Sequence, residues 1–163
     1  MDTQLTEIFG RNRLINDLLQ SDVEVATPVR DRGIDLIAYL DLDQQGGKFA
    51  AIPIQIKTAT HRSFSIDRKY AKFPNLLLAF VWGIEQPESA TIYAVSYSEA
   101  TSIGREMGWL ETVSWIDGGK YVTNAPSKRL LDLLGPYEVR AGGWKARITS
   151  ALSADKMPGV SCR

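Results

Sequence analysis

Three polar side chains on two neighbouring segments have the types that phosphodiester hydrolysis needs. Asp35 lies in the segment Ile34–Leu42, and Gln55 and Lys57 lie in Phe49–Thr58. Both segments read as β-strands joined by a tight turn. Because alternate residues of a strand share a face, Gln55 and Lys57 point to one side, and Asp35 begins the matching face of its own strand. We therefore expect an acid, an amide and an amine together, opposite an apolar face.

These side chains suit a divalent cation and a phosphate. Mg²⁺ prefers oxygen ligands and is usually held by one or two carboxylates plus waters. Asp35 is the expected main ligand, with the amide oxygen of Gln55 and the backbone carbonyl of Ile56 as neutral ligands. Lys57 is expected to orient or deprotonate the attacking water, or to offset charge on the phosphate. The pattern predicts a catalytic site with Mg²⁺ or Mn²⁺ as its cofactor.

A further carboxylate comes from the first predicted helix, residues 4–20, whose apolar residues recur at helical spacing. Glu7 lies at the edge of that apolar stripe, in line with Arg11. A side chain there can extend over the rim of the sheet on which the helix packs. We therefore expect Glu7 to be an accessory metal ligand and catalytic residue, and an ordinary solvated helix residue is the alternative interpretation.

Gly33-Ile34-Asp35 followed by Gln55-Ile56-Lys57-Thr58 resembles the PD-(D/E)XK nuclease superfamily, and most closely its QxK branches. Those branches include the Mrr-like restriction endonucleases, and the pattern is also similar to archaeal-type Holliday-junction resolvases. The resemblance covers roughly residues 1–100. It implies a Mg²⁺-dependent DNA endonuclease, often a homodimer, with a restriction-endonuclease-like fold in which helices flank a central four-stranded mixed sheet. The sequence departs from the family pattern twice, because Gln55 replaces an acid and Ile34 replaces a proline.

The remaining elements predict an α/β class, with a central mixed β-sheet flanked by helices. Further strands are expected at 23–29, 76–81 and 91–96, with a helix at 97–107. After Gly108 we expect a hairpin of strands 111–116 and 120–123, and then a helix from Pro126 to Leu134. We expect one domain over residues 1–150, with a core at about 1–100, an elaboration at about 101–150 and a flexible tail at 151–163.

The charge balance argues against a tight, sequence-independent DNA binder. Lys plus Arg equals Asp plus Glu at 19 each, whereas nucleic-acid binders usually carry a basic surface. Basic residues are nevertheless concentrated between Lys57 and Lys72, where five accompany one acid. A DNA-contacting rim and a solvated face are both compatible with this run. The side chains expected at such a rim are Arg11, Arg62, Lys69 and Tyr70.

Several classes of protein are disfavoured. The longest apolar stretch, residues 76–82, is too short to span a bilayer, and the N-terminus lacks the features of a secretory signal. The one cysteine, Cys162, excludes an internal disulfide, so we expect a cytoplasmic protein. The glycine-rich pieces lack P-loop spacing, and no organic cofactor is expected. His61 is the one histidine and is expected to be inert, so a hydrolase triad is disfavoured.

Two functions therefore remain. The first is a metal-dependent endonuclease acting in defence against foreign DNA or in DNA repair. The second is a catalytically inactive nuclease-fold module that binds nucleic acid or a protein partner, in which Gln55 marks the loss of an acid. A partner-binding surface within residues 98–150 is also compatible with the sequence.

Overall fold

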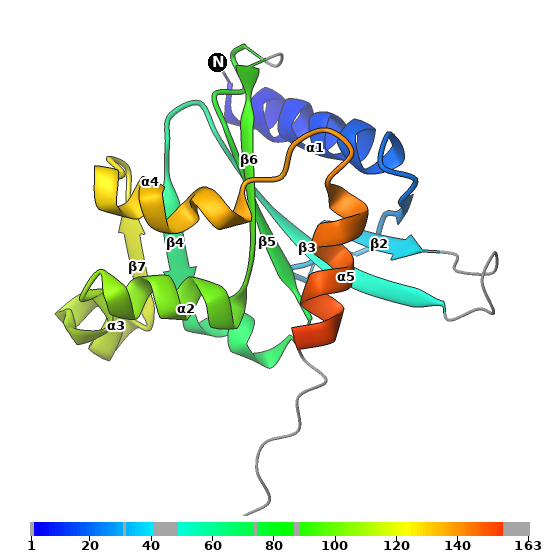
Figure 1. Ribbon diagram of the computed structural model, residues 1–163. Coiled ribbons are helices and arrows are strands. Elements are labelled where there is room, and N and C mark those ends of the chain that lie inside the picture. The colour runs from blue at the N-terminus through cyan, green and yellow to red at the C-terminus, as the bar shows by residue number, and fades with distance from the viewer. Residues whose placement is uncertain (1, 31, 41–48, 74, 87–88, 155–163) are drawn as a thin grey trace, which may run out of the picture.

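Five strands form one mixed sheet in a computed structural model that describes residues 2–30, 32–40, 49–73, 75–86 and 89–154. The strand order is β1-β2-β3-β5-β6, and β3 and β5 run parallel while the other neighbours are antiparallel (Figure 1). The strands are β1 Glu24–Ala26, β2 Leu36–Leu40, β3 Ala50–Ala59, β5 Leu77–Trp82 and β6 Thr91–Ser96. The predicted fold class, a central mixed sheet flanked by helices, is confirmed.

The long strand β3 changes its hydrogen-bonding partner near its middle. Residues 50–54 pair with β2, and the β2 register ends where Leu36 lies opposite Ile54. Residues 54–59 pair instead with β5, on the other edge. Beyond Ile54, the edge of β3 that faced β2 is therefore no longer covered by that strand.

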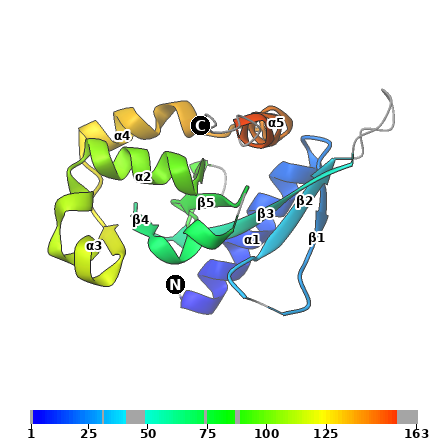
Figure 2. The same cartoon turned by 90° about the horizontal axis from the view of Figure 1, so that it is seen from below.

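Each face of the sheet is covered by helices with its own apolar core. Helices α1 (Thr3–Leu19) and α5 (Trp144–Ala154) contribute Leu14, Leu18, Trp144 and Ile148 to the first core. Helices α2 (Tyr97–Glu106) and α4 (Lys128–Leu134) pack on the second core. Figure 2 shows α1 on the opposite side of the sheet from α2 and α4. The continuously apolar β5 lies between the two cores, which is why all six of its residues are buried.

A small second sheet extends the second core. Strand β4 (Phe64–Asp67) pairs with β7 (Lys120–Thr123) in antiparallel register. The 3₁₀ helix η2 (Arg68–Lys72) follows β4 directly, and its N-cap is Asp67, whose carboxylate accepts a hydrogen bond from the Lys69 amide at 3.0 Å. The remaining short elements are η4 Trp109–Glu111, α3 Val113–Gly118 and η5 Gly135–Tyr137.

The predicted hairpin of 111–116 and 120–123 is wrong, although its second strand is present as β7. Residues Val113–Gly118 form the helix α3, and β7 pairs with β4, which lies far earlier in the chain. The alternation of Val113 and Trp115 before a Gly-Gly turn imitates a strand. The helical turn is preferred here because it buries Trp115 in the second core while leaving Val113 exposed.

The predicted start of the next helix is also wrong. Ser127 is the N-cap of α4, with its hydroxyl accepting from the Leu130 amide at 3.3 Å, so Pro126 precedes the helix instead of occupying its first turn.

Helix α5 was not predicted, and it extends to Ala154, past the residue at which we expected the tail to begin. Residues 41–48, with the expected strand end and hairpin turn, and residues 155–163, with Cys162, lie outside the described residues. None of the described helices is long and apolar enough to cross a bilayer.

Candidate functional site

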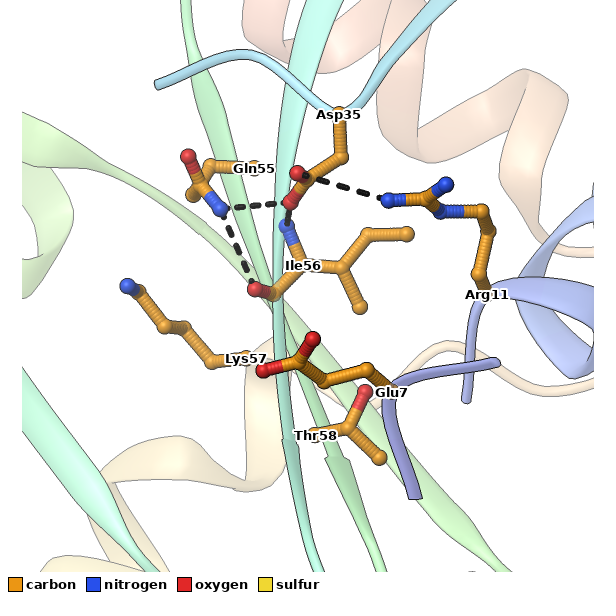
Figure 3. Close-up of a pocket in the computed structure, with 7 residues that line it drawn as sticks. All are labelled: Glu7, Arg11, Asp35, Gln55, Ile56, Lys57 and Thr58. Carbon is orange, nitrogen blue, oxygen red and sulfur yellow. Dashed lines mark hydrogen bonds and ion pairs between the residues drawn. The ribbon is translucent and has the colours of Figure 1, made fainter. Parts of the chain in front are cut away.

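A hollow of about 240 Å³ opens at the point where β3 loses β2 as its neighbour (Figure 3). It is lined by Glu7, Arg11, Asp35, Gln55, Ile56, Lys57 and Thr58. The structure therefore brings together every residue that the sequence pattern predicted for metal binding or catalysis. Gln55 and Lys57 enter from one side of β3, while Glu7 and Arg11 enter from the side of α1.

Asp35 occupies the position of the missing strand at the edge of β3. Its backbone amide donates to the Ile54 carbonyl at 2.9 Å, and one carboxylate oxygen accepts from the Ile56 amide at 2.6 Å. The side chain of Asp35 is only 10% exposed. A carboxylate thus replaces a backbone carbonyl as the partner of a strand amide, which fixes Asp35 against β3.

The side-chain amide of Gln55 presents its nitrogen to the same carboxylate. Its Nε2 lies 2.5 Å from Asp35 Oδ2 and 3.3 Å from the Ile56 carbonyl oxygen. Its Oε1 faces Gly33, at 3.9 Å from the position that a Cβ on that residue would take. We expected this oxygen to bind the metal, and the amide must turn by about half a rotation about its last torsion to supply it.

Gly33 places Asp35 outside the regular strand. Its φ of +91° lies in a region that favours glycine, so the chain turns there before β2 begins at Leu36. Strand alternation from Leu36 would put Ile34 on the same face as Leu36. Ile34 packs against the second core instead, because the turn at Gly33 interrupts the alternation.

Lys57 lies on the same side of β3 as Gln55, and its ammonium is positioned by an aromatic ring. Its Nζ is 5.3 Å from the ring centroid of Tyr70, and Lys69 Nζ is 5.0 Å from that centroid. Tyr70 is 2% exposed, so this ring is a fixed part of the second core. A cation over an aromatic face is stabilised by the ring's quadrupole, and this contact restricts where the Lys57 ammonium can lie.

Glu7 and Arg11 reach the hollow because α1 approaches β3 very closely at Gly10. A Cβ on Gly10 would lie 2.1 Å from Thr58 Oγ1 and 2.4 Å from its Cγ2, so only glycine fits without a shift of the helix or of Thr58. Glu7 is one helical turn before this contact. Arg11 follows it directly, and its Nη2 lies 3.9 Å from Asp35 Oδ1. With Arg11 47% exposed, this ion pair contributes little stability.

The donor set fits a hard divalent cation. Asp35 and Glu7 supply carboxylate oxygens, and the Ile56 carbonyl points off the same uncovered strand edge as the Ile56 amide that Asp35 binds. Oxygen ligands of this kind are those that Mg²⁺ and Mn²⁺ take. Within the described ranges no group of three or more His, Cys, Asp and Glu gathers. A cation here would therefore keep several waters, as Mg²⁺ usually does.

The residues expected to contact DNA fall into different places. Arg11 lines the hollow, and Lys69 lies beside it with its side chain 57% exposed. Tyr70 supports both lysines from the core. Arg62 lines a second hollow of about 540 Å³, together with His61 and Asn124. Thr58, which we did not single out as a site residue, lines the first hollow, and its place in the strand one residue after Lys57 was the available signal.

The ammonium of Lys69 is held in its charged form. Burial lowers the pKa of Lys69, but the neighbouring Tyr70 and Asp67 outweigh burial and raise this pKa above its ordinary value. Lys69 Nζ lies 3.6 Å from Asp67 Oδ2. A full positive charge therefore contacts the same ring as Lys57 throughout the neutral pH range.

Comparison with known proteins gave a similarity to a solved structure. No family model matches this chain, and no curated protein matches it. Among solved structures, the chain is similar to that of a bacterial homing endonuclease, I-Ssp6803I, with a TM-score of 0.47 and 15% sequence identity. The similarity covers 96% of this chain and 99% of that one.

Proposed function

We propose that this chain is a divalent-metal-dependent endonuclease of the PD-(D/E)XK type that hydrolyses phosphodiester bonds in DNA, in defence against foreign DNA or in DNA repair. The observation that supports this proposal is the hollow at the uncovered edge of β3. There the carboxylates of Asp35 and Glu7, the Ile56 carbonyl and the Lys57 side chain line one cavity. These are the groups that hydrolysis of a phosphodiester with metal assistance requires.

Each residue has a distinct role in this proposal. Asp35, Glu7 and the Ile56 carbonyl would hold the cation, which when bound polarises the phosphate and lowers the pKa of a bound water. Asp35 is fixed by the Ile56 amide, so its orientation does not depend on the substrate. Lys57 donates to the scissile phosphate or to the attacking water and stabilises the negative charge that develops on the phosphate oxygens. Gln55 orients the Asp35 carboxylate through its side-chain nitrogen.

Cleavage of supercoiled plasmid tests the proposal. We expect the purified chain to nick or linearise plasmid with Mg²⁺ or Mn²⁺, and EDTA to abolish the cleavage. Asp35→Ala and Asp35→Asn, prepared identically to exclude a contaminating nuclease, should each reduce the rate by at least about 10²-fold, because the main metal ligand is removed. Wild-type rates in both variants would refute the assignment of the site.

One observation favours a second candidate, an inactive nuclease-fold module that binds nucleic acid. The Gln55 nitrogen donates to Asp35 from a position where an acid of the family pattern would share a cation with it. A neutral amide that donates to this carboxylate stabilises it without a metal. The two candidates differ in one result, because the inactive module binds duplex DNA but leaves plasmid intact at every Mg²⁺ and Mn²⁺ concentration.

A further inference from the structure

Three cations of η2 each lie over an aromatic ring. The guanidinium carbon of Arg68 is 5.1 Å from the ring centroid of Trp115. Lys69 Nζ is 5.0 Å from the ring of Tyr70, and Lys72 Nζ is 5.0 Å from the ring of Phe73. We call Arg68, Lys69 and Lys72 the basic row. All three are exposed, so the rings hold their charges at the surface.

The basic row begins at the candidate site. Tyr70 is shared between Lys69 of the row and Lys57 of the hollow. At the other end of η2, Phe73 ring atoms lie 3.8 Å from the position of a Cβ on Gly33, which is the residue that Gln55 Oε1 also faces. The row therefore borders the hollow on the Gln55 and Lys57 side, away from α1.

The row concentrates positive charge in a chain whose net charge is zero. Asp67 is the one acid between Lys57 and Phe73, and it is already engaged as the N-cap of η2 and as the ion-pair partner of Lys69. Lys120 lies opposite Asp67 in the register of β4 and β7 and adds another exposed cation beside it. The positive excess is thus local and directly beside the site.

The rings make this cluster more than an ordinary solvated face. Trp115 is 9% exposed and Tyr70 is 2% exposed, so both rings are fixed by the core around them. The cations lie over rings that keep their positions. Arg68 is tied further, because its Nη2 donates to the Trp115 carbonyl at 3.0 Å. Side chains that are ordered before binding lose less conformational entropy when an anion arrives. Several cations that are ordered before binding suit a ligand that carries several negative charges.

We propose that the phosphate backbone of duplex DNA runs along the basic row, entering the hollow at Lys57, so that Arg68, Lys69 and Lys72 position the strand that is cut. This inference rests on the proposed function for the identity of the ligand, and it assigns Arg68 and Lys72 a role that the motif does not give them. The flank formed by α1 then supplies Glu7 to the metal, and the flank formed by η2 holds the DNA.

Fluorescence anisotropy with a fluorescein-labelled 30-base-pair duplex, in EDTA, tests the row without cleavage. The variant is Lys69→Gln with Lys72→Gln, and the matched control is Lys128→Gln with Lys145→Gln, two exposed lysines on α4 and α5. We expect the row variant to lose affinity about tenfold. The negative slope of log K against log salt should become shallower by about 1.8, since each phosphate that is no longer neutralised reduces its magnitude by about 0.9. The control should change less than about twofold. Equal loss in both variants, or no loss in the row variant, overturns the proposal.

A second pair of variants tests the aromatic support. Tyr70→Phe keeps the ring beneath Lys69, and Tyr70→Leu removes it. We expect a smaller loss of affinity in the first variant, which lacks only the hydroxyl, than in the second, where the loss should be about two- to fivefold, as one exposed cation–π contact predicts. Circular dichroism should confirm that both variants are folded. Equal affinities in two folded variants would show that the ring does not organise the row.

Failure of the row and failure of the proposed function are distinguishable. If Asp35→Ala cleaves plasmid normally, the catalytic assignment fails while the anisotropy result stands. If wild-type chain does not bind the duplex even at low salt, the row proposal fails whatever the plasmid assay shows.

Discussion

The two flanks of the hollow are held in place by different kinds of contact. On one flank, α1 rests against β3 through Gly10 and Thr58, with no space for a single added carbon. On the other flank, η2 meets Lys57 through a ring centroid 5.3 Å from its ammonium. The first contact is a steric fit between a helix backbone and a strand, whereas the second is an electrostatic contact that tolerates small movements.

This difference implies that the two flanks have different functions, one in metal binding and the other in phosphate binding. Metal ligands need positions fixed to within a fraction of an ångström, and Glu7 is placed by the rigid flank. A phosphate backbone is recognised by charge, which acts over a longer range than metal coordination, so the cations of η2 need less exact placement. Changes on the α1 flank should therefore alter stability together with activity, while changes on the η2 flank should alter activity and binding with little effect on stability.

The largest effect is expected on the η2 flank at the hollow itself. Lys57→Ala should reduce the single-turnover rate of plasmid cleavage by about 10²–10⁴-fold, because the group that stabilises developing charge or moves a proton is removed. The melting temperature should change by less than about 3 °C, since the residue is partly exposed. A variant that cleaves within a few-fold of wild type would remove Lys57 from the mechanism.

The next largest effect is expected from a substitution that disrupts the contact between α1 and β3. Gly10→Ala forces a methyl group against Thr58 and should destabilise the fold by about 1–3 kcal/mol in urea unfolding, as overpacking of a core contact does. Cleavage should fall as well, because Glu7 moves with the helix. Combining it with Thr58→Ala removes two of the three crowding atoms, so part of the stability should return. No recovery in the double variant would mean that this contact is not what positions α1.

A smaller effect lies at the strand edge between the flanks. Gln55→Glu replaces the amide donor by a second carboxylate beside Asp35, which adds a charged oxygen ligand. We expect calorimetric titration to show Mn²⁺ binding about tenfold tighter than in wild type. Without metal, stability should fall by about 1 kcal/mol, because two like charges then face each other. Weaker Mn²⁺ binding would contradict the placement of the cation beside Gln55.

The smallest effect is expected at Arg11, whose exposed pair with Asp35 spans 3.9 Å. Arg11→Gln should change the free energy of unfolding by no more than about 0.5 kcal/mol. If Arg11 also contacts DNA on the α1 flank, Arg11→Gln should remove one phosphate contact. The negative slope of log K against log salt, measured with labelled duplex in EDTA, should then become shallower by about 0.9. A loss as large as that of the doubly substituted basic row would show that the two flanks share the DNA.

The residues that line the hollow could be predicted from the sequence because local patterns of strand and helix periodicity place most of them. Gln55 and Lys57 lie on β3, where alternation fixes that they share a face, and Asp35 directly precedes the neighbouring strand β2. Glu7 followed from the apolar stripe of one helix. The orientation of the Gln55 amide could not be predicted, because it depends on Gly33 and on the hydrogen bonds that the carboxylate finds in the folded chain.

The remaining differences come from contacts between distant segments. Strand β7 pairs with β4, a partner that no local pattern identifies, and a neighbouring Gly-Gly turn favoured the wrong hairpin. Burial of Tyr70 and the placement of Arg62 at a second hollow depend on how the chain turns after β3. Helix α5 is an exception. Its buried residues Trp144, Ile148 and Ala151 recur at helical spacing, and this signal was present in the sequence.

The most direct test of the central claim is a crystal structure of the chain soaked in Mn²⁺, with anomalous scattering used to locate the ion. We expect an anomalous peak at the uncovered edge of β3, within coordination distance of an Asp35 carboxylate oxygen and the Ile56 carbonyl, and we expect Asp35→Asn to abolish it. A peak elsewhere on the chain, or no peak in the wild-type hollow at saturating Mn²⁺, would contradict the assignment of this hollow as a metal site.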